Sequence, residues 1–316
     1  MASLNRSETA CFLADRDHFS IVTHRRPDGD TLGSAAVLCL GLRQLGKTAH
    51  ILRNPEITEK YVHLHENLTK EAPEAGDTLI SVDVASPNML GEHFATLENS
   101  IALRIDHHST ATSFTPSELV DGDAAACGEI IYDVLTLLGV TLDVPMANAL
   151  YTAVSTDTGC FRYANTTSHS FEVAAACAKV SSDLFAINQA LFETNSLGRL
   201  RLQGWLVENA LFLQGGKIAI CALPLAKEQE LGLSEDDLEN ISGFPRTIAG
   251  VKIAATLRQE PSGLIKLSVR AVPGYDAAAI CKEFGGGGHK GAAGASMDMT
   301  MDAAVRAVAE AMPHIV

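Results

Sequence analysis

The apolar run from Phe19 to His24 predicts a strand. Its last residue, His24, begins the segment His24-Arg25-Arg26-Pro27-Asp28-Gly29-Asp30. Proline and glycine allow a tight turn here, and that turn can direct one imidazole and two carboxylates toward the same point beyond the strand. Such a set of side chains is typical of metal ligands. Two other interpretations stay open, because Asp28-Gly29 is common in turns and Asp30 can cap a following helix.

The first half of the chain alternates short apolar runs with helical patterns. Strands are predicted at Phe19 to His24, Thr48 to Leu52, Thr78 to Asp83 and Ile101 to Asp106, and helices at Thr31 to Leu45, Ser86 to Leu97 and Gly128 to Leu138. This alternation predicts an α/β fold in which a mainly parallel sheet is covered by flanking helices. Ligands bind at the carboxyl ends of strands in such a sheet, and His24, Asp83 and Asp106 each lie at such an end.

The second half predicts more helices and then a change of pattern. Helical spacing continues at Pro145 to Thr156, Ser168 to Val180 and Ile187 to Leu213, and Gly215-Gly216 ends it. Strands are then predicted at Lys217 to Leu223, Gly250 to Arg258 and Gly263 to Val272, with helices at Ala277 to Phe284 and Met301 to Ala311. We therefore expect a first domain over residues 1–186, a helical connector over 187–214 and a smaller α+β domain over 215–316.

The composition fits a folded protein without a membrane anchor. The chain has 316 residues, of which 47% are hydrophobic, and its longest apolar runs fall well short of the roughly 20 residues that span a bilayer. The N-terminus lacks an apolar stretch of secretory length, so we expect a cytoplasmic protein. The seven cysteines are scattered and odd in number, which predicts small buried residues rather than disulfides or a zinc site.

Charge is distributed unevenly along the chain. The formal net charge of −14 argues against a protein that coats long duplex nucleic acid. Residues 246–290, however, contain seven Lys/Arg and three acids, so this segment carries +4 and the remainder −18. The sequence therefore predicts a local basic patch near the C-terminus.

Further acids end other apolar segments. Asp83 ends one predicted strand, Asp106-His107-His108 ends another, and Asp157 follows a predicted helix. A carboxylate at the end of a buried strand is costly to desolvate without a partner, which favours a shared cation. Six ligands are too many for one ion and suit two divalent ions with a bridging carboxylate; they are His24, Asp28, Asp30, Asp83, His107 and Asp157. Because no thiolate is among them, Mn²⁺ or Mg²⁺, with Co²⁺ as a further substitute, is favoured over structural Zn²⁺.

These motifs together resemble the DHH phosphoesterase superfamily. The resemblance rests on His24-x-x-Pro27-Asp28-Gly29-Asp30, Asp83, Asp106-His107-His108 and Asp157 in this order. The segment from Phe284 to Gly294, which includes Gly285 to Gly288 and His289, resembles the DHHA1 substrate-binding domain of that superfamily. Length and domain order are most similar to the branch of oligoribonucleases (nanoRNases) that also act as phosphatases on 3′-phosphoadenosine 5′-phosphate (pAp).

The resemblance implies a role for each matching residue. One Mn²⁺ would be held by His24, Asp28 and Asp83, and a second by Asp30, Asp83, His107 and Asp157, with Asp83 as the bridge. His108 would contact the scissile phosphate or protonate the leaving oxygen, while Asp106 would orient the two histidines. Gly285, Gly286, Gly287, Gly288 and His289 would bind the phosphate and nucleotide end of the substrate. Members of the family often carry Ser-x-Arg-Ser before the glycine run, whereas this chain has Ser268-Val269-Arg270-Ala271; Arg270 remains a candidate phosphate contact, and the finer substrate preference stays open.

We therefore expect a Mn²⁺-dependent enzyme that hydrolyses short oligoribonucleotides to mononucleotides, and pAp to AMP, with a water that two metals activate. Its partners would be short single-stranded RNA or small nucleotides, and a homodimer is possible. A cyclic or linear dinucleotide phosphodiesterase is the alternative, an inorganic pyrophosphatase or polyphosphatase is less favoured, and a regulator without turnover is a further alternative. Phe161 and Tyr163 follow Asp157 and could stack a base, although aromatic residues after a helix end are more often core.

Overall fold

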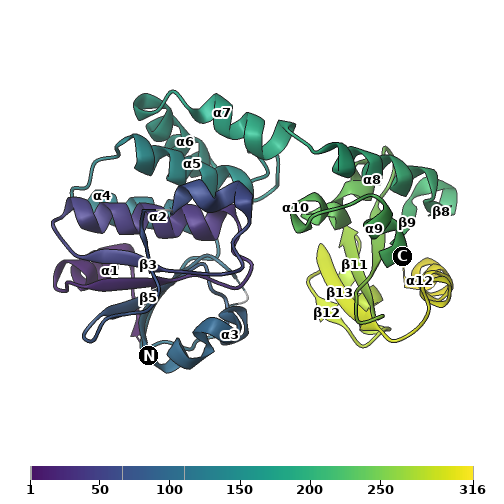
Figure 1. Ribbon diagram of the computed structural model, residues 1–316, viewed down its shortest axis with the longest axis horizontal. Coiled ribbons are helices and arrows are strands. Elements are labelled where there is room, and N and C mark those ends of the chain that lie inside the picture. Colours follow the sequence, from purple (N-terminus) through teal and green to yellow (C-terminus); the bar gives the residue numbers. More distant parts are fainter. Residues whose placement is uncertain (1, 66, 110, 316) are drawn as a thin grey trace. The chain divides into compact units, whose positions relative to one another are not determined.

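The computed structural model describes residues 2–65, 67–109 and 111–315. The chain forms two compact units, and the boundary between them along the sequence falls between Thr194 and Asn195 (Figure 1). This boundary lies inside the stretch 187–214 that the sequence predicts as a connector. The seven cysteines are all free, and five of them are buried. Within the part of the chain described, no helix is long and apolar enough to cross a membrane.

The first unit is built on a parallel sheet. Its strands are β1 (Ala2–Ser3), β2 (Phe19–Val22), β3 (Ala49–Leu52), β4 (Thr69–Lys70), β5 (Thr78–Val82), β6 (Ile101–Asp106) and β7 (Ser117–Val120). They lie in the order β1-β7-β6-β5-β2-β3-β4, and each pair of neighbours is parallel. The predicted mainly parallel α/β fold is confirmed. Because β6, β5 and β2 are adjacent, the segments that follow them meet at one edge of the sheet.

Helices cover this sheet (Figure 1). They are α1 (Arg6–Ala14), α2 (Gly29–Gln44), α3 (Gly91–Phe94), α4 (Cys127–Leu137), α5 (Val144–Asp157), α6 (Ser168–Val180) and α7 (Leu184–Asn188), with 3₁₀ turns η1 (Glu59–Leu64), η2 (Pro87–Met89) and η3 (Ala95–Ser100) and a π-helical turn η4 (Gln189–Glu193). The single helix predicted over Ser86 to Leu97 is wrong, since η2, α3 and η3 replace it. Gly91 explains the break, because its φ of +71° is incompatible with a right-handed helix.

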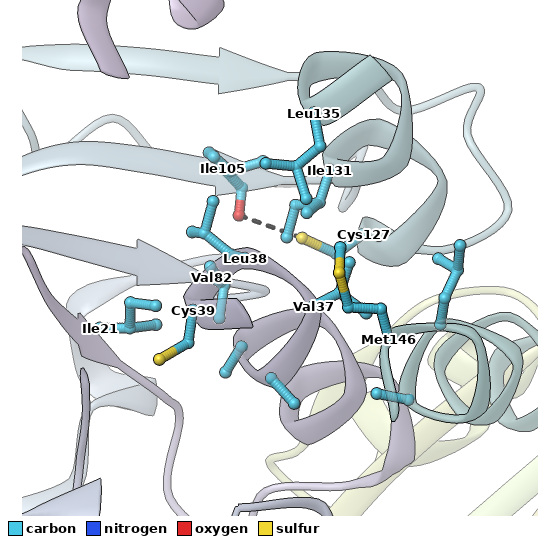
Figure 2. Packing of buried hydrophobic residues seen from close by; sticks show 14 of the residues in the cluster. Ile21, Val37, Leu38, Cys39, Val82, Ile105, Cys127, Ile131, Leu135 and Met146 are labelled. Atoms are coloured by element: carbon cyan, nitrogen blue, oxygen red, sulfur yellow. Dashed lines mark hydrogen bonds between the residues drawn. The ribbon is translucent and has the colours of Figure 1, made fainter. Parts of the chain in front are cut away.

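The main core lies between the sheet and helices α2 and α4. Figure 2 shows Val37 and Leu38 of α2 among strand residues such as Ile105, all of them fully buried. Cys127 at the start of α4 donates its thiol to the Ile105 carbonyl oxygen, 3.4 Å away. Burial of each such aliphatic side chain contributes about 1.5–3 kcal/mol to the hydrophobic stabilisation. The core thereby fixes the first turns of α2 and α4 against the carboxyl edge of the sheet.

Close packing sets α2 against α5. A Cβ atom added at Gly33 would lie 2.4 Å from the Ala149 carbonyl oxygen, and one at Gly29 would lie 2.5 Å from the Thr156 side chain. These contacts pair the start of α2 with the end of α5, so the two helices are antiparallel. The residue that ends α5, Asp157, is therefore brought beside the first turn of α2.

The second unit has a mixed sheet in the order β12-β13-β11-β10-β9-β8. Its elements are α8 (Leu197–Glu208), β8 (Leu211–Leu213), η5 (Gln214–Gly216), β9 (Ile218–Leu223), α9 (Leu225–Glu230), α10 (Glu235–Leu238), η6 (Ile241–Thr247), β10 (Ile253–Gln259), β11 (Ile265–Ala271), α11 (Ala277–Lys282), β12 (Gly287–Gly288), β13 (Ala292–Met297) and α12 (Met301–Ile315). Only the β9–β10 pairing among these described strands is parallel. The second, α+β domain is thus confirmed as a fold.

Two differences from the sequence prediction concern this unit. Residues 211–213 were predicted as helix but form β8, because the left-handed Gly215 and Gly216 turn the chain back so that β8 pairs with β9. The strand β13 was not predicted, since its run Ala292-Ala293-Gly294-Ala295-Ser296-Met297 lacks β-branched and aromatic residues. It is stabilised instead by pairing with β11 on one side and β12 on the other.

Gly33→Ala should destabilise the first unit by about 1–3 kcal/mol, because the new methyl group has to displace the backbone of α5. The matched control is Gly204→Ala in α8, where no heavy atom lies within 4 Å of the added Cβ. There the better helix propensity of alanine should stabilise by up to about 1 kcal/mol. Urea unfolding measures both variants, and a Gly33→Ala protein as stable as the parent would contradict the close packing.

Candidate metal centre

The sequence-predicted ligands come from four segments that meet at the carboxyl edge of the first sheet. His24, Asp83 and His107 follow the adjacent strands β2, β5 and β6. The two aspartates at positions 28 and 30 begin α2, and Asp157 ends α5. All six predicted ligands lie in the first unit and are brought together.

The first turn of α2 gives its two aspartates different surroundings. Asp28 is the residue that caps the helix, since its Oδ1 accepts from the Thr31 N–H at 3.1 Å. Asp30 is fully buried, and it accepts from the N–H groups of Cys127 at 2.7 Å and Gly128 at 3.0 Å. Those donors open α4, so the positive end of that helix stabilises the Asp30 carboxylate. The capping role that the sequence left open for Asp30 therefore belongs to Asp28.

Asp83 is shared between two groups of ligands. Its Oδ2 accepts from the Thr31 hydroxyl at 2.6 Å and lies 3.7 Å from Nε2 of His24. Its Oδ1 lies 3.5 Å from Nε2 of His107 and has no hydrogen-bond partner, although the residue is only 2% exposed. The backbone of Asp83 has a φ of +58°, which is unusual for a residue other than glycine and is typical of functional sites.

Each ligand histidine is oriented by its backbone contact. Nδ1 of His24 lies 2.7 Å from the Arg25 carbonyl oxygen, and Nδ1 of His107 lies 3.2 Å from that of Ala124. These contacts leave Nε2 of each ring facing carboxylates. This is the arrangement of metal-binding histidines, in which the second ring nitrogen is held by a carbonyl.

The side chains fit divalent cations. Two sets, His24/Asp28/Asp83 and Asp30/His107/Asp157, each have ligand atoms within 4.8 Å of one another, and a third set is Asp83/His107/His108. The imidazole-to-carboxylate separations across the first two sets run from 3.3 to 4.0 Å, longer than good hydrogen bonds. These long separations, and the Asp83 oxygen that lacks a hydrogen-bond partner, leave several polar atoms without good hydrogen bonds. Cations placed between those atoms would satisfy them best. Oxygen and imidazole donors without thiolate suit a hard divalent ion such as Mn²⁺ or Mg²⁺.

The crowding of charge shifts the pKa values of the buried ligand candidates. Burial disfavours the imidazolium of His24, but the Asp83 carboxylate outweighs this and raises its pKa to about 9. The same opposition at His107, with Asp83 and Asp30 as neighbours, raises its pKa to about 11. Burial and the charge of Asp83 raise the pKa of Asp30 well above its ordinary value, whereas the attraction of the neighbouring His107 and His24 outweighs burial and lowers the pKa of Asp83. Burial raises the pKa of Asp157 to about 7.

His108 has a different partner from His107. Its Nδ1 lies 2.8 Å from Oδ1 of Asp106, and the Asp106 oxygen also accepts from the backbone N–H of His107 at 2.9 Å. This hydrogen bond to Asp106 raises the pKa of His108 above its ordinary value. His108 is about one-third exposed, so an imidazole held by Asp106 lies at the border of the ligand cluster.

Arg104 is a functional candidate that the sequence prediction missed. It lies inside β6 and is only 1% exposed. Its Nη1 donates to the carbonyl oxygens of Ala85 at 3.1 Å and Thr112 at 2.9 Å, and its Nη2 lies 3.1 Å from Glu118. It thereby ties the segment after Asp83 to the segment after His108. An arginine within an apolar run was the available signal, because a buried guanidinium needs several acceptors.

The predicted substrate contacts lie in the second unit. Arg270 is half-buried in β11, and burial together with the charge of Arg246 lowers its pKa. The glycine run forms part of the sheet: Gly286 and Gly288 lie so close to β13 that added Cβ atoms would be 2.1 and 2.6 Å from its backbone. The N–H groups of Gly285 and Gly286 donate to carbonyl oxygens of α11. They are therefore unavailable to a phosphate, and so is the N–H of His289, which donates to the Ala292 carbonyl oxygen at 2.8 Å. The exposed Gly287 and Gly288 and the exposed side chain of His289 remain as candidate phosphate contacts.

Known proteins resemble the whole chain. The DHH family, N-terminal domain, matches residues 18–154, and the DHHA1 domain matches residues 215–313. The bifunctional oligoribonuclease and PAP phosphatase NrnA of Thermus thermophilus is 32% identical over 92% of this chain and 88% of its own length. NrnA of Mycoplasma genitalium is 27% identical over 88% of both. The crystal structure of an exopolyphosphatase-related protein from Bacteroides fragilis, 22% identical, has a TM-score of 0.87 and covers 98% of this chain and 96% of that one, which supports the fold.

Binding of Mn²⁺ to the metal-free chain should release protons and tighten with pH. His24 and His107, with pKa values of about 9 and 11, each carry a proton at neutral pH that a metal ligand must lose. The dissociation constant should fall roughly ten-fold per pH unit for each proton displaced. Calorimetry in buffers of different ionisation enthalpy measures the release. An affinity that is constant between about pH 6 and pH 9 would contradict these protonation states.

Arg104→Lys should weaken Mn²⁺ binding about 10- to 100-fold, because lysine cannot hold the Ala85 and Thr112 carbonyls and Glu118 together. The matched control is Arg6→Lys, which breaks the ion pairs of Arg6 with Asp121 and Asp133 in the same unit. Both variants should lose stability, but only Arg104→Lys should lose metal affinity in equilibrium titration. Equal metal affinity in the two variants would show that Arg104 acts on stability alone.

Proposed function

The chain belongs to the DHH family of phosphoesterases with a DHHA1 domain, and from that premise we propose that it hydrolyses short oligoribonucleotides to mononucleotides and pAp to AMP. Two relatives, each of which aligns with this chain over most of its own length, carry both activities in their names. The position of Asp83 is the observation that carries the proposal. Its two oxygens face different histidines, His24 and His107, so a single buried carboxylate is available to both ligand sets.

The proposal gives each ligand set one cation. His24, Asp28 and Asp83 would hold one, and Asp30, Asp83, His107 and Asp157 would hold the other. Mn²⁺ is the ion that we propose, with Mg²⁺ or Co²⁺ as substitutes. When bound, two divalent ions neutralise phosphate charge and make water a better nucleophile for in-line attack.

The chain itself supplies the proton for the leaving group. Nδ1 of His108 is held by Asp106, which leaves its Nε2 to donate to the oxygen whose bond to phosphorus breaks. The new bond forms between phosphorus and the water oxygen, so no covalent intermediate with a side chain is required. Asp106 acts as a positioning residue, since it fixes the orientation of His108 and favours its protonated form.

Residues of the second unit would recognise the rest of the substrate. The charge of Arg246 acts on Arg270, and this repulsion favours the binding of an anion at Arg270. His289, at the end of the glycine run, is exposed and would add a second polar contact. This division assigns bond cleavage to the first unit and the binding of a further anionic group of the substrate to the second.

A substrate panel tests the reaction. With Mn²⁺, the protein should release phosphate from pAp and mononucleotides from di- to pentaribonucleotides, faster than it hydrolyses cyclic di-AMP or pyrophosphate. Asp83→Asn should lower the rates at least about 100-fold, because it removes the shared ligand. The control Asp133→Asn alters a carboxylate of α4 that pairs with Arg6, and it should keep its activity. Near-normal turnover by Asp83→Asn would contradict the shared-ligand mechanism, and a preference for cyclic di-AMP would replace the proposed substrates.

Arg270→Ala and His289→Ala should raise KM for short RNA roughly 10- to 100-fold, the loss expected for one charge-assisted contact, with little change in kcat. Lys266→Ala, an exposed position on the same strand as Arg270, is the control. Bound Mn²⁺ should stay the same in all three variants by elemental analysis. Parallel loss of Mn²⁺ and activity would place these residues in the metal centre and contradict the assignment.

A further inference from the structure

The turn after α5 has an unusual backbone. Gly159, Cys160 and Phe161 are three successive residues with φ values of +57°, +58° and +61°. The left-handed region is unfavourable for residues with a Cβ, and it persists only where neighbouring contacts enforce it. Here the Cys160 N–H donates to the Ser155 carbonyl oxygen at 2.6 Å and the Phe161 N–H to the Thr158 hydroxyl at 3.1 Å. The turn is therefore fixed at the end of the helix that carries Asp157.

The turn sends its two aromatic residues in different directions. Phe161 packs against the main core, with its ring stacked on that of Phe171 at 5.3 Å between centroids. Phe161 is thus a partly buried residue packed against the core, in line with the interpretation that such aromatic residues are core. Tyr163, two residues later, is 54% exposed, so the same interpretation is wrong for it.

One face of the Tyr163 ring is covered by backbone. A Cβ atom added at Gly159 would lie 2.3 Å from Cζ of that ring, so the ring rests directly on the glycine. The Tyr163 N–H donates to the Thr158 carbonyl oxygen at 3.0 Å, and the Asn165 side chain donates to that of Asp157 at 3.1 Å. Tyr163 and Asp157 are therefore parts of one hydrogen-bonded turn. The ring is therefore a fixed aromatic surface that rests on Gly159, four residues earlier in the chain, in the same turn as the metal-ligand candidate Asp157.

We propose that Tyr163 is a specificity-determining residue that stacks on the nucleobase next to the scissile phosphate. The proposal rests on the proposed function, since it names how that site selects nucleotides. A ring held on one face and open to solvent on the rest loses little freedom when a base covers it. Stacking accepts any base, because every base has a π-face, so Tyr163 would select nucleotides over base-free phosphoesters without choosing among sequences.

The test compares substrates with and without a base. Tyr163→Ala should lower kcat/KM for pAp about 5- to 150-fold, the range of one base–aromatic stack, and should leave that for ribose 3′,5′-bisphosphate nearly unchanged. Tyr163→Phe should keep both rates, because the ring and not the hydroxyl is required. Gly159→Ala, which displaces the ring, should give the same selective loss if its bound Mn²⁺ is unchanged. Phe185→Ala removes another exposed aromatic, 70% accessible, and should change neither rate.

An equal loss of kcat/KM on both substrates in Tyr163→Ala would show that Tyr163 only supports Asp157. No loss on either substrate would show that Tyr163 makes no contact with the substrate. Each of these two results overturns the proposal.

Calorimetric binding of AMP and of ribose 5-phosphate distinguishes a failure of this proposal from a failure of the proposed function. If the parent protein hydrolyses neither bisphosphate, the proposed function fails, and the binding data still decide the role of Tyr163. A weaker AMP affinity in Tyr163→Ala, with ribose 5-phosphate unaffected, supports stacking; an unchanged AMP affinity overturns it.

Discussion

Asp30 and Asp83 lie almost completely buried beside each other, and the first unit is organised around compensating their charge. Isolated buried carboxylates are strongly disfavoured, so each requires donors or cations. Asp30 receives them from the first N–H groups of α4, whereas Asp83 receives one hydroxyl hydrogen bond and keeps an oxygen without a partner. Two divalent cations would neutralise what the protein leaves uncompensated. In the metal-free site the carboxylates instead raise the pKa values of His24 and His107 far above the ordinary value, so these histidines hold protons.

The packing of strands and helices brings the ligands together at the carboxyl edge of the first sheet. The parallel order of β6, β5 and β2 brings three loops to one edge, and the small residues Gly29 and Gly33 let α2 approach α5 closely enough to add Asp157. Arg104 then joins two of the loops, because its side chain donates to the carbonyl oxygens of Ala85 and Thr112. The position of each ligand thus depends on the hydrophobic core and on helix contacts as much as on the motif residues themselves.

The sequence predicted what depends on local pattern. Strand ends such as Asp83 and Asp106 could be recognised because apolar runs stop there, and all six predicted ligands meet at one edge. Features that depend on tertiary contact could not be predicted. β13 has no strand propensity of its own, the N–H groups of Gly285 and Gly286 are taken by α11, and the exposure of Tyr163 follows from a left-handed turn that no local pattern indicates. The contacts of Arg104 belong to the same class.

The central claim is that one carboxylate, Asp83, serves two cations. Equilibrium dialysis with Mn²⁺, combined with low-temperature electron paramagnetic resonance of the loaded protein, tests it most directly. The account predicts two ions per chain with a spectrum of an exchange-coupled pair, and loss of the coupling and of tight binding in Asp83→Asn. A single ion per chain, or two ions that remain uncoupled and are retained by Asp83→Asn, would contradict it.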